Sequence, residues 1–317
     1  MATTYLDFEK PIAELENRVA DLKATAQKGA IDIDADVARL EAKANKLLRE
    51  TYSRLTPWQK AQVARHPDRP HFKHYLGLIA EDFVELAGDR AFADDPAILG
   101  GLARIGERRV MIIGHEKGDD TASRLRHNFG MAKPEGYRKA IRLFELADKF
   151  SLPVITLVDT AGAYPGIAAE ERGQAEAIAR STDCCLKLGV PIVSIILGEG
   201  GSGGAIAIAT ANRIIMLEHA IYSVISPEGA ASIIWRDSTK REEAATAMKI
   251  TAQDLEQLGV IDDIVKEPIG GAHRDHKSVI RAIGDALAAA LAEFDGKAPL
   301  EVRKLRHDRF LEIGRSL

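Results

Sequence analysis

A turn rich in glycine is the part of this sequence whose residue types best suit chemistry. Residues 198–204 (GEGGSGG) place five glycines in seven positions, between the apolar run IVSIIL and the helical run AIAIATA. Free backbone N–H groups point out of a helix start, and glycine lets a ligand approach them without a Cβ in the way. The turn therefore predicts a site for a phosphate group or an oxyanion.

The same turn fits a dinucleotide-binding pattern, but its surroundings argue against that function. Gly198, Gly200 and Gly203 satisfy G-x-G-x-x-G, and Glu218 lies 20 residues after Gly198. The helix after the turn has room for only about two turns, and Glu218 leads into a further strand rather than a helix. No G-x-x-x-x-G-K-[ST] sequence occurs, which excludes a P-loop. A nucleophilic Ser202 and a purely structural turn both remain open interpretations.

A second turn, residues 159–166 (DTAGAYPG), follows the apolar run VITLV. Pro153 and Pro191 lie 38 residues apart, and each precedes a buried β run that ends in one of the two glycine-bearing turns. Corresponding strands of such a repeat lie side by side. The two turns should therefore form one shelf of N–H groups at the same edge of a sheet, suited to a carbonyl-bearing ligand.

Strand patterns alternate with helical patterns in the second half of the chain, which predicts an α/β fold. GGLARI and RVMIIGHEKG flank the turn GERR and indicate a hairpin. Helices are expected at 135–150 and 170–188, and short strands at RIIMLEH and IYSVIS. A further helix should begin with Ser226 as N-cap and Pro227 in its first position. Strands at this spacing imply repeated β-α units buried on both faces.

Helical patterns also lie near both ends of the sequence. Residues 12–28 and 37–52 carry narrow apolar stripes and predict an antiparallel hairpin, joined by the acidic linker AIDIDAD. Packing of this hairpin on the chain's own core and packing on another subunit are equally open. An amphipathic helix at 278–294 precedes a basic stretch at 300–315, for which a solvated helix is favoured over a contact with an acidic partner.

Composition bounds the class of protein. The 317 residues are 46% hydrophobic and 28% charged, with a formal net charge of -4, which is ordinary for a soluble globular protein. This balance favours neither nucleic acid nor a membrane surface as a partner. No apolar run reaches the ~20 residues of a spanning helix, and the start resembles no signal peptide. These features predict a cytoplasmic protein.

Metal binding by this chain is not expected. Cys184 and Cys185 are the two cysteines, and their adjacency suits small residues on a helix rather than zinc ligands. His66, His71 and His74 lie close in sequence, but no acidic or thiol ligand stands at a matching offset.

Nine phrases of the sequence resemble the alpha subunits of acetyl-coenzyme A carboxylase carboxyltransferase. They are LDFEKPIAELE, ARHPDRP, ELAGDRAFADD, NFGMAKPEGYRKA, DTAGAYPG, EERGQAEAIA, GEGGSGGA, YSVISPEGAASI and EPIGGAHRD, in register over about 270 residues. The resemblance implies an α/β, crotonase-like spiral of β-β-α units. It also implies an N-terminal helical hairpin at residues 1–55 and a carboxyltransferase domain at 56–317.

The resemblance further implies a reaction. The family transfers the carboxyl group of carboxybiotin to acetyl-CoA, giving malonyl-CoA for fatty acid synthesis. Carboxybiotin releases CO₂, the biotin nitrogen takes the methyl proton of acetyl-CoA, and the enolate attacks CO₂. Carried over by motif, the N–H groups of Gly203 and Gly204 form the biotin-side oxyanion hole. Residues expected to line the biotin cleft are Gly162, Ala163, Tyr164, Gly166, Gly201 and Ser202.

Partners are implied in the same way. The family pairs this subunit with a beta subunit that binds acetyl-CoA and carries a zinc ribbon. The assembly contains two alpha and two beta chains. Biotin arrives on a biotin carboxyl carrier protein, after loading by biotin carboxylase. The resemblance therefore implies no covalently bound cofactor and no zinc in this chain, and activity only with the beta subunit.

Two departures from the family pattern and one rival function complete the expectations. Ala161 stands where the family has proline, and Asp119 where it tends to have arginine, so Asp119 is not assigned to the site. A valine at Gly204 is expected to block the ligand and to strain a turn with positive φ. The rival function is a self-sufficient crotonase-type enoyl-CoA hydratase or isomerase, with Glu199 and Glu228 as its acid and base. A non-catalytic scaffold is the third hypothesis.

Overall fold

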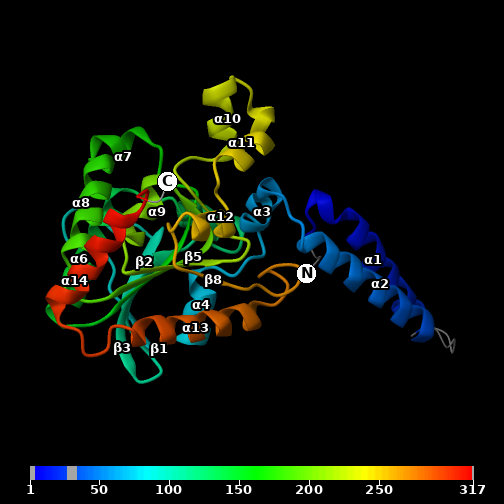
Figure 1. Ribbon diagram of the computed structural model, residues 1–317, viewed down its shortest axis with the longest axis horizontal. Coiled ribbons are helices and arrows are strands. Elements are labelled where there is room, and N and C mark those ends of the chain that lie inside the picture. Colours follow the sequence, from blue (N-terminus) through cyan, green and yellow to red (C-terminus); the bar gives the residue numbers. More distant parts are fainter. Residues whose placement is uncertain (1–3, 27–33, 316–317) are drawn as a thin grey trace.

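The computed structural model describes residues 4–26 and 34–315 of the chain. Its body is one eight-stranded sheet with helices packed against it (Figure 1). The strands are β1 (Glu81–Glu85), β2 (Ile98–Ile105), β3 (Arg108–His115), β4 (Val154–Thr160), β5 (Ile192–Gly201), β6 (Arg213–Leu217), β7 (Ile221–Ser223) and β8 (Asp263–Val265). Their order across the sheet is β1-β2-β3-β4-β5-β6-β8, and β7 pairs with the end of β5.

The sheet is antiparallel on one side and parallel through its centre. β2 and β3 form the predicted hairpin, which turns at Gly106 with a φ of 55°. From β3 through β4, β5 and β6 to β8, neighbouring strands are parallel. β4 is buried along its whole length and β5 everywhere except Gly201, as expected of strands covered on both faces. The carboxyl ends of these strands therefore meet at one edge of the sheet.

Helices connect the strands and cover the sheet. They are α1 (Lys10–Ala26), α2 (Asp34–Tyr52), α3 (Pro57–Ala64), α4 (Phe72–Ile79), α5 (Thr121–Arg126), α6 (Pro134–Lys149), α7 (Ile167–Glu171), α8 (Gln174–Lys187), α9 (Ser202–Ala209), α10 (Pro227–Trp235), α11 (Arg241–Ala247), α12 (Ala252–Gln257), α13 (His276–Ala292) and α14 (Pro299–Glu312), with short 3-10 turns η1 (Asp7–Glu9), η2 (Asn128–Gly130) and η3 (Ser238–Lys240). Successive strands joined by helices confirm the predicted α/β, crotonase-like architecture.

One predicted helix is in fact two. The expected helix at 170–188 is divided into α7 and α8 by Gly173, whose φ of 81° is left-handed. A left-handed residue interrupts the helical hydrogen-bond ladder, and glycine adopts this conformation at little cost. α7 consequently follows the second glycine turn as a short separate element, whereas α8 packs on α6 and α9.

The N-terminal hairpin consists of α1 packed against α2, and both helices extend from the body (Figure 1). Ile12, Leu48, Tyr52, Leu55 and Val63 form a small apolar core where the hairpin meets the body. The hairpin thus packs on its own chain at this end. Most of the predicted linker lies outside the described residues, and the domain boundary at residue 55 stays a prediction.

The C-terminal basic helix is not simply solvated. Arg306 of α14 is fully buried, and its guanidinium donates to the carbonyl oxygens of Cys185, Leu188 and Val190 at 2.8, 2.7 and 2.6 Å. Cys185 lies in the last turn of α8 and the other two residues follow that helix, so the arginine caps α8 and holds α14 against it. The remaining exposed part of the stretch leaves the acidic-partner hypothesis untested. Within the described residues no helix is long and apolar enough to cross a membrane.

Candidate functional site

The two glycine-bearing turns touch backbone to backbone at the carboxyl edge of the sheet. A Cβ at Gly201 would overlap the carbonyl oxygen of Ala161. A Cβ at Gly204 would lie 2.7 Å from the carbonyl carbon of Gly162, closer than real side chains approach. Glycine is therefore required at both positions to let the turns meet. The predicted juxtaposition of the two turns is confirmed.

The first turn ends in an open helix start. Gly201 is the N-cap of α9 and has no side chain to bind the first amides, so the N–H groups of Gly203 and Gly204 lack an intrahelical acceptor. The expected positive φ at Gly204 is wrong, because that residue already lies in α9. The left-handed conformations belong instead to Ser202, with a φ of 51°, and to Gly162, with a φ of 153°.

The other expected cleft residues divide into two groups. Ala163 contributes its backbone beside Gly204, at 2.9 Å from the position of an added Cβ. Tyr164 contacts the segment before α6, where its amide donates to the Ala132 carbonyl at 2.9 Å, and Gly166 is the N-cap of α7. The Lys133 ammonium lies 5.1 Å from the centroid of the Tyr164 ring. The structure therefore gathers the glycine backbones at one point and places Tyr164 at the margin.

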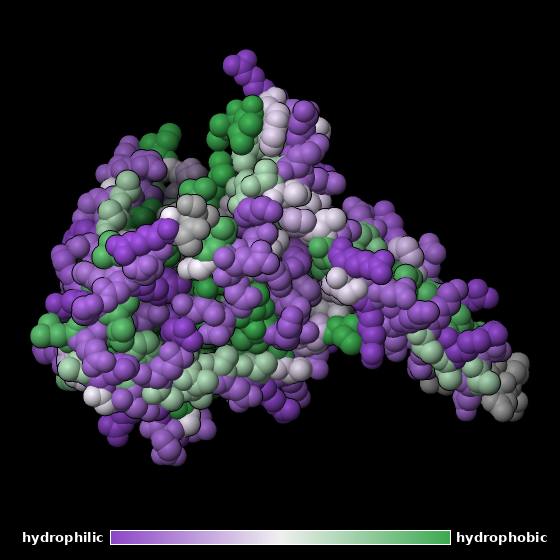
Figure 2. All heavy atoms as spheres, viewed as in Figure 1, coloured by the Kyte–Doolittle hydropathy of each residue, from purple (hydrophilic) through white to green (hydrophobic). Residues whose placement is uncertain are grey.

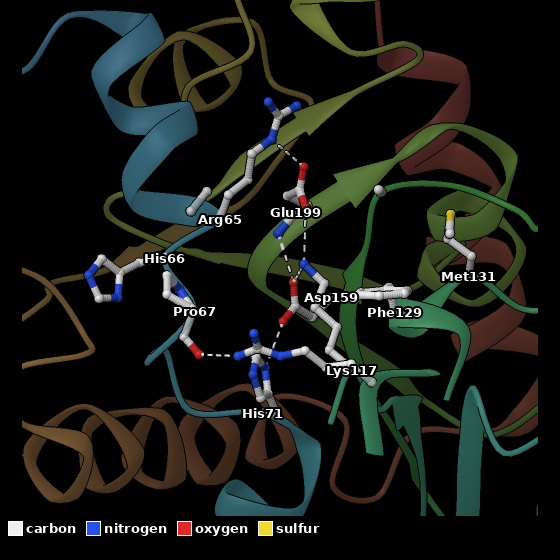
Figure 3. A pocket seen from close by; sticks show the side chains of 12 residues that line it. Arg65, His66, Pro67, His71, Lys117, Phe129, Met131, Asp159 and Glu199 are labelled. Carbon is white, nitrogen blue, oxygen red and sulfur yellow. Dashed lines mark hydrogen bonds and ion pairs between the residues drawn. The ribbon is translucent and has the colours of Figure 1, made fainter. Parts of the chain in front are cut away.

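A largely buried group of charged side chains, which we call the turn cluster, connects the two turns, and Figure 3 labels its members other than Glu228. It consists of Arg65, Lys117, Asp159, Glu199 and Glu228. The Lys117 ammonium lies 2.8 Å from Asp159 Oδ1 and 3.0 Å from Glu199 Oε2. Arg65 lies 2.6 Å from both Glu199 Oε1 and Glu228 Oε1. The backbone N–H of Glu199 donates to Asp159 Oδ1 at 3.0 Å.

The ionisation of the cluster follows from its pairing. Burial by itself would raise the pKa of the Asp159 carboxyl, but Lys117 and His71 outweigh burial and hold that pKa well below its ordinary value. Burial would likewise raise the pKa of Glu199, and Lys117 with Arg65 lowers it instead. The two carboxylates in turn keep the Lys117 pKa above its ordinary value against the effect of burial. All three groups therefore remain charged at neutral pH.

Cavities open on both sides of Glu199. A cavity of about 310 Å³ is bounded by this cluster and by the apolar side chains of Phe129 and Met131. A smaller one of about 30 Å³ is lined by Arg65, Ala161 and the backbone of Gly200 and Gly201. A ligand in the larger cavity would thus meet both an apolar wall and the charged side chains of Lys117, Asp159 and Glu199.

Sequence reasoning missed Lys117 and Arg65, and treated Asp159 only as a turn-former. One signal was available. Lys117, Asp159 and Glu199 each stand at or just after the carboxyl end of one of three adjacent strands, β3, β4 and β5. Parallel strands bring such residues to one edge. Arg65 follows α3, and its position gave no comparable signal.

The third turn has the predicted structural role. The Ser226 side chain accepts a hydrogen bond from the Gly229 amide at 3.1 Å, and Pro227 occupies the first position of α10. Glu228 of the same turn is bound to Arg65, which also holds Glu199. Both carboxylates proposed as a hydratase acid and base are therefore paired with one guanidinium. Lys117 and Arg65 hold the pKa of Glu199 below its ordinary value despite burial, so this carboxyl is poorly suited to donate a proton.

Ring geometry argues against a shared metal ion at the histidines that the structure describes. His66 accepts from the Asp68 amide through Nδ1 and contacts the Thr4 carbonyl through Nε2, at 3.1 Å in each case. His66, His273 and Glu9 lie close enough to share an ion, but the two rings are stacked at 3.7 Å with an interplanar angle of 11°. Metal ions bind in the plane of imidazole, so stacked rings do not direct their nitrogens at one ion.

The two departures from the family pattern lie at the rim of the site. Ala161 is exposed and lines both cavities beside Glu199. The side chain of Asp119 is 59% exposed and lies 3.8 Å from His74 Nδ1. Neither side chain belongs to the turn cluster.

Comparison with known proteins gives a consistent result. The family described as acetyl co-enzyme A carboxylase carboxyltransferase-like matches residues 5–314. The acetyl-coenzyme A carboxylase carboxyl transferase subunit alpha of Rhizorhabdus wittichii is 66% identical, over 98% of this chain and 99% of that protein. The subunit of the same name from Zymomonas mobilis is 65% identical, over 98% of this chain and 99% of that protein.

Solved structures share the fold at lower identity. The transcarboxylase 12S core with methylmalonyl-coenzyme A bound has a TM-score of 0.56 and 21% identity, over 70% of this chain and 41% of that one. A chain of a Pseudomonas malonate decarboxylase hetero-tetramer in complex with coenzyme A also has a TM-score of 0.56, with 18% identity over 68% of this chain and 91% of that one. On the match to the family and the identity to its members, this chain belongs to the alpha subunits of acetyl-CoA carboxylase carboxyltransferase.

Proposed function

We propose that the open start of α9 is the biotin-side oxyanion hole of a carboxyltransferase, formed by the amides of Gly203 and Gly204. The observation that carries this proposal is the contact of the two turns. Gly201 and Gly204 abut the backbone of the second turn so closely that no side chain fits between them. Backbone amides held rigid by such a contact need little reorganisation when negative charge develops, which is what electrostatic catalysis requires.

In the proposed reaction, the C–N bond of carboxybiotin breaks and leaves CO₂ and a ureido anion. The amides of Gly203 and Gly204 hold the negative charge on the ureido oxygen. The biotin nitrogen then removes a methyl proton from acetyl-CoA, and the resulting enolate carbon bonds to CO₂ to give malonyl-CoA. Biotin ends protonated and the carboxyl group has moved, so no protein base is needed. Gly162, Ala163, Gly201 and Ser202 line the cleft, with Tyr164 and Gly166 at its margin.

The partners are those of the family. A beta subunit binds acetyl-CoA, carries the zinc and completes a two-alpha, two-beta assembly. Biotin carboxylase and a biotin carboxyl carrier protein deliver carboxybiotin, and the reaction takes place in the cytoplasm. The family name supports a partner subunit, and the malonate decarboxylase chain of similar extent comes from a hetero-tetramer.

An exposed apolar surface near the site supports the proposal that the beta subunit binds there. Ile233 and Ile234 of α10 are 72% and 63% exposed, and Val224 before it is 72% exposed. Ile167 of α7, on the second turn's side, is 81% exposed. Figure 1 shows α10 and α7 rising from the body on the same side, and Figure 2 shows apolar atoms gathered on the α10 projection. Apolar side chains exposed in this number indicate an interface.

The assay that tests the proposed function is the reverse half-reaction, in which malonyl-CoA transfers its carboxyl group to biocytin. It is run with this chain alone, with the beta subunit alone and with the two co-expressed. The expected result is acetyl-CoA formation only in the mixture. No activity in a well-assembled mixture, or hydration of an enoyl-CoA by this chain alone, would contradict the proposal.

The surface is tested by Ile234→Asp, with Leu78→Asp as the matched control, because Leu78 is 54% exposed on α4. The α10 variant should retain far less beta subunit in size-exclusion chromatography, and the control should retain the normal amount. Equal retention by both variants would remove α10 from the interface.

A further inference from the structure

Each glycine-bearing turn carries a buried carboxylate beside the place where negative charge must be bound. Asp159 opens the second turn and Glu199 stands within the first, and their side chains are 3% and 10% exposed. Gly203 is four residues beyond Glu199, so its amide lies within about 14 Å of that residue along the chain. An unpaired charge at such a distance in a low-dielectric site repels an anion appreciably. The site therefore needs these carboxylates to be compensated.

Lys117 is placed to compensate both carboxylates at once. It follows β3, the strand next to β4, and its ammonium contacts Asp159 at 2.8 Å and Glu199 at 3.0 Å. The Lys117 side chain is only 15% exposed, so water screens these contacts weakly. Arg65 holds the other oxygen of Glu199 at 2.6 Å. One buried cation thus bridges the two turns, and a second secures the first of them.

We propose that Lys117 is a positioning residue that cancels the negative charge of Glu199 and Asp159 beside the oxyanion-binding amides, so that the two turns accept an anion. This inference rests on the proposed function of the turns and adds a residue to it. Lys117 does not touch the substrate in this account. It acts through the carboxylates on either side of it.

A purely mechanical role is the alternative, in which Lys117 only ties the turns together. The two roles differ in what happens when the negative charge is removed as well. If the loss of Lys117 slows the reaction mainly because the uncompensated carboxylates repel the anion, then removing the Glu199 carboxylate as well restores much of the rate. If Lys117 acts mainly by connecting the two turns, then the double variant loses at least as much rate as the variant without Lys117 alone.

The experiment is a double-mutant cycle in the assembled enzyme, using malonyl-CoA and biocytin. The variants are Lys117→Met, Glu199→Gln and the combination of the two, with Lys117→Arg retaining the charge. Lys117→Met should lower kcat about 100-fold, in the range seen when one element of an oxyanion hole is lost, with KM for malonyl-CoA changed less than about threefold. The double variant should recover at least about tenfold, and Lys117→Arg should stay within about tenfold of wild type.

The pH profile provides a readout that a mechanical role would not move. Without Lys117, burial raises the pKa values of Asp159 and Glu199, so these groups take up protons as the pH falls. The deficit of Lys117→Met relative to wild type should therefore shrink from pH 9 to pH 6. A deficit that is constant across this range would contradict the proposal. The variant leaves unchanged the other charged or titratable groups around Lys117, Asp159 and Glu199, which are Arg65, Arg69, His71, His115 and Glu228.

Two controls separate the possible failures. Lys187→Met removes an exposed lysine of α8 whose partner is Asp183, and its rate should equal that of wild type. Should Lys117→Met not assemble, Glu199→Gln alone still tests the inference. It should keep at least about a third of the rate, and a loss of about 100-fold would give Glu199 a direct role and overturn the proposal. Inactive wild type would overturn the proposed function itself. Active wild type with no rescue in the double variant would overturn only the role of Lys117.

Discussion

Two regions of the molecule bury charged side chains in different ways. In the turn cluster, Lys117, Asp159 and Glu199 come from the ends of three neighbouring strands and pair with one another. The start of α9, which follows β5, has no side-chain cap. In the second region, which we call the joint cluster, Glu9, Glu16, Tyr52 and Arg274 connect the N-terminal hairpin to the body. There the Tyr52 hydroxyl donates to Glu9 at 2.9 Å and Arg274 donates to Glu16 at 2.7 Å.

The two clusters differ in whether unpaired backbone amides lie next to them. The Glu9 carboxylate is fully used, because its oxygens accept from Tyr52 and from the Leu6 amide while Arg274 lies 3.6 Å away. Such a network fixes the hairpin on the body and uses both oxygens of the Glu9 carboxylate. The turn cluster fixes the strand ends, and the open start of α9 beside it keeps its donors. Changes in the first region should alter catalysis, and changes in the second should alter stability.

The largest effect on activity is expected from Gly204→Ala compared with Gly203→Ala. A Cβ at Gly204 meets the backbone of Gly162 at 2.7 Å, whereas at Gly203 it meets the flexible side chain of Ile178 at 3.2 Å. The first substitution must push the turns apart, so carboxyl transfer should fall on the order of 10²–10³-fold. The second should cost about tenfold or less. Rates of the reverse half-reaction measure both. Similar losses in the two variants would show that contact between the turns is unimportant.

The largest effect on stability is expected from Arg69→Met, between the two regions. The side chains of Arg69 and Glu267 are 2% and 0% exposed and form two hydrogen bonds of 2.8 and 2.9 Å. Without the arginine, the Glu267 carboxylate stays buried but loses its ion-pair partner. This should lower the free energy of unfolding by about 3–5 kcal/mol. Urea denaturation of wild type and variant at pH 7 gives the difference. A loss below about 1 kcal/mol would mean that the carboxylate is relieved by water or protonation.

Acid should remove the same contribution from the wild type. Burial favours the neutral form of Glu267, but Arg69 outweighs it and lowers the pKa from 4.5 to about 2. Since the pKa is lower in the folded state, this stabilisation is present above pH 4.5 and is lost as the pH falls toward 2. The loss from this group is about 3 kcal/mol. The difference between wild type and Arg69→Met should therefore shrink over this interval, and a constant difference from pH 7 to pH 3 would contradict the assignment.

The smallest effect is expected in the joint cluster. Tyr52→Phe removes one hydrogen bond to Glu9 and should lower the free energy of unfolding by about 1–2 kcal/mol. The carboxyl-transfer rate of the assembled enzyme should be unchanged, since the turns are untouched. Measured together, stability and rate test the separation of the two regions. A tenfold loss of rate in this variant would link the hairpin to the site.

The sequence was informative where structure depends on local pattern. The two turns were placed side by side because the repeat around Pro153 and Pro191 aligns β4 with β5. The helix of two turns after Gly201 was also predicted from spacing. Errors arose where one residue overrides a pattern, as at Gly173, which divides α7 from α8, and at Ser202, which takes the left-handed conformation expected of Gly204.

The turn cluster and the joint cluster could not be derived from periodicity. Arg65 and Glu228 are 163 residues apart, and Arg274 and Glu16 are 258 residues apart. Which cation meets which carboxylate depends on the order of strands and on helix packing, and neither is encoded in the spacing of the charges. Family resemblance supplied the function for the same reason, since the glycine turn alone also permitted phosphate and dinucleotide binding.

The central claim is that the amides at the start of α9 hold the biotin oxyanion. The most direct measurement is a crystal structure of this chain assembled with its beta subunit and bound to biocytin. We expect the ureido oxygen at about 3 Å from the amide nitrogens of Gly203 and Gly204, with the bicyclic ring against the second turn. A ureido group bound elsewhere, with those amides facing only solvent, would contradict the account.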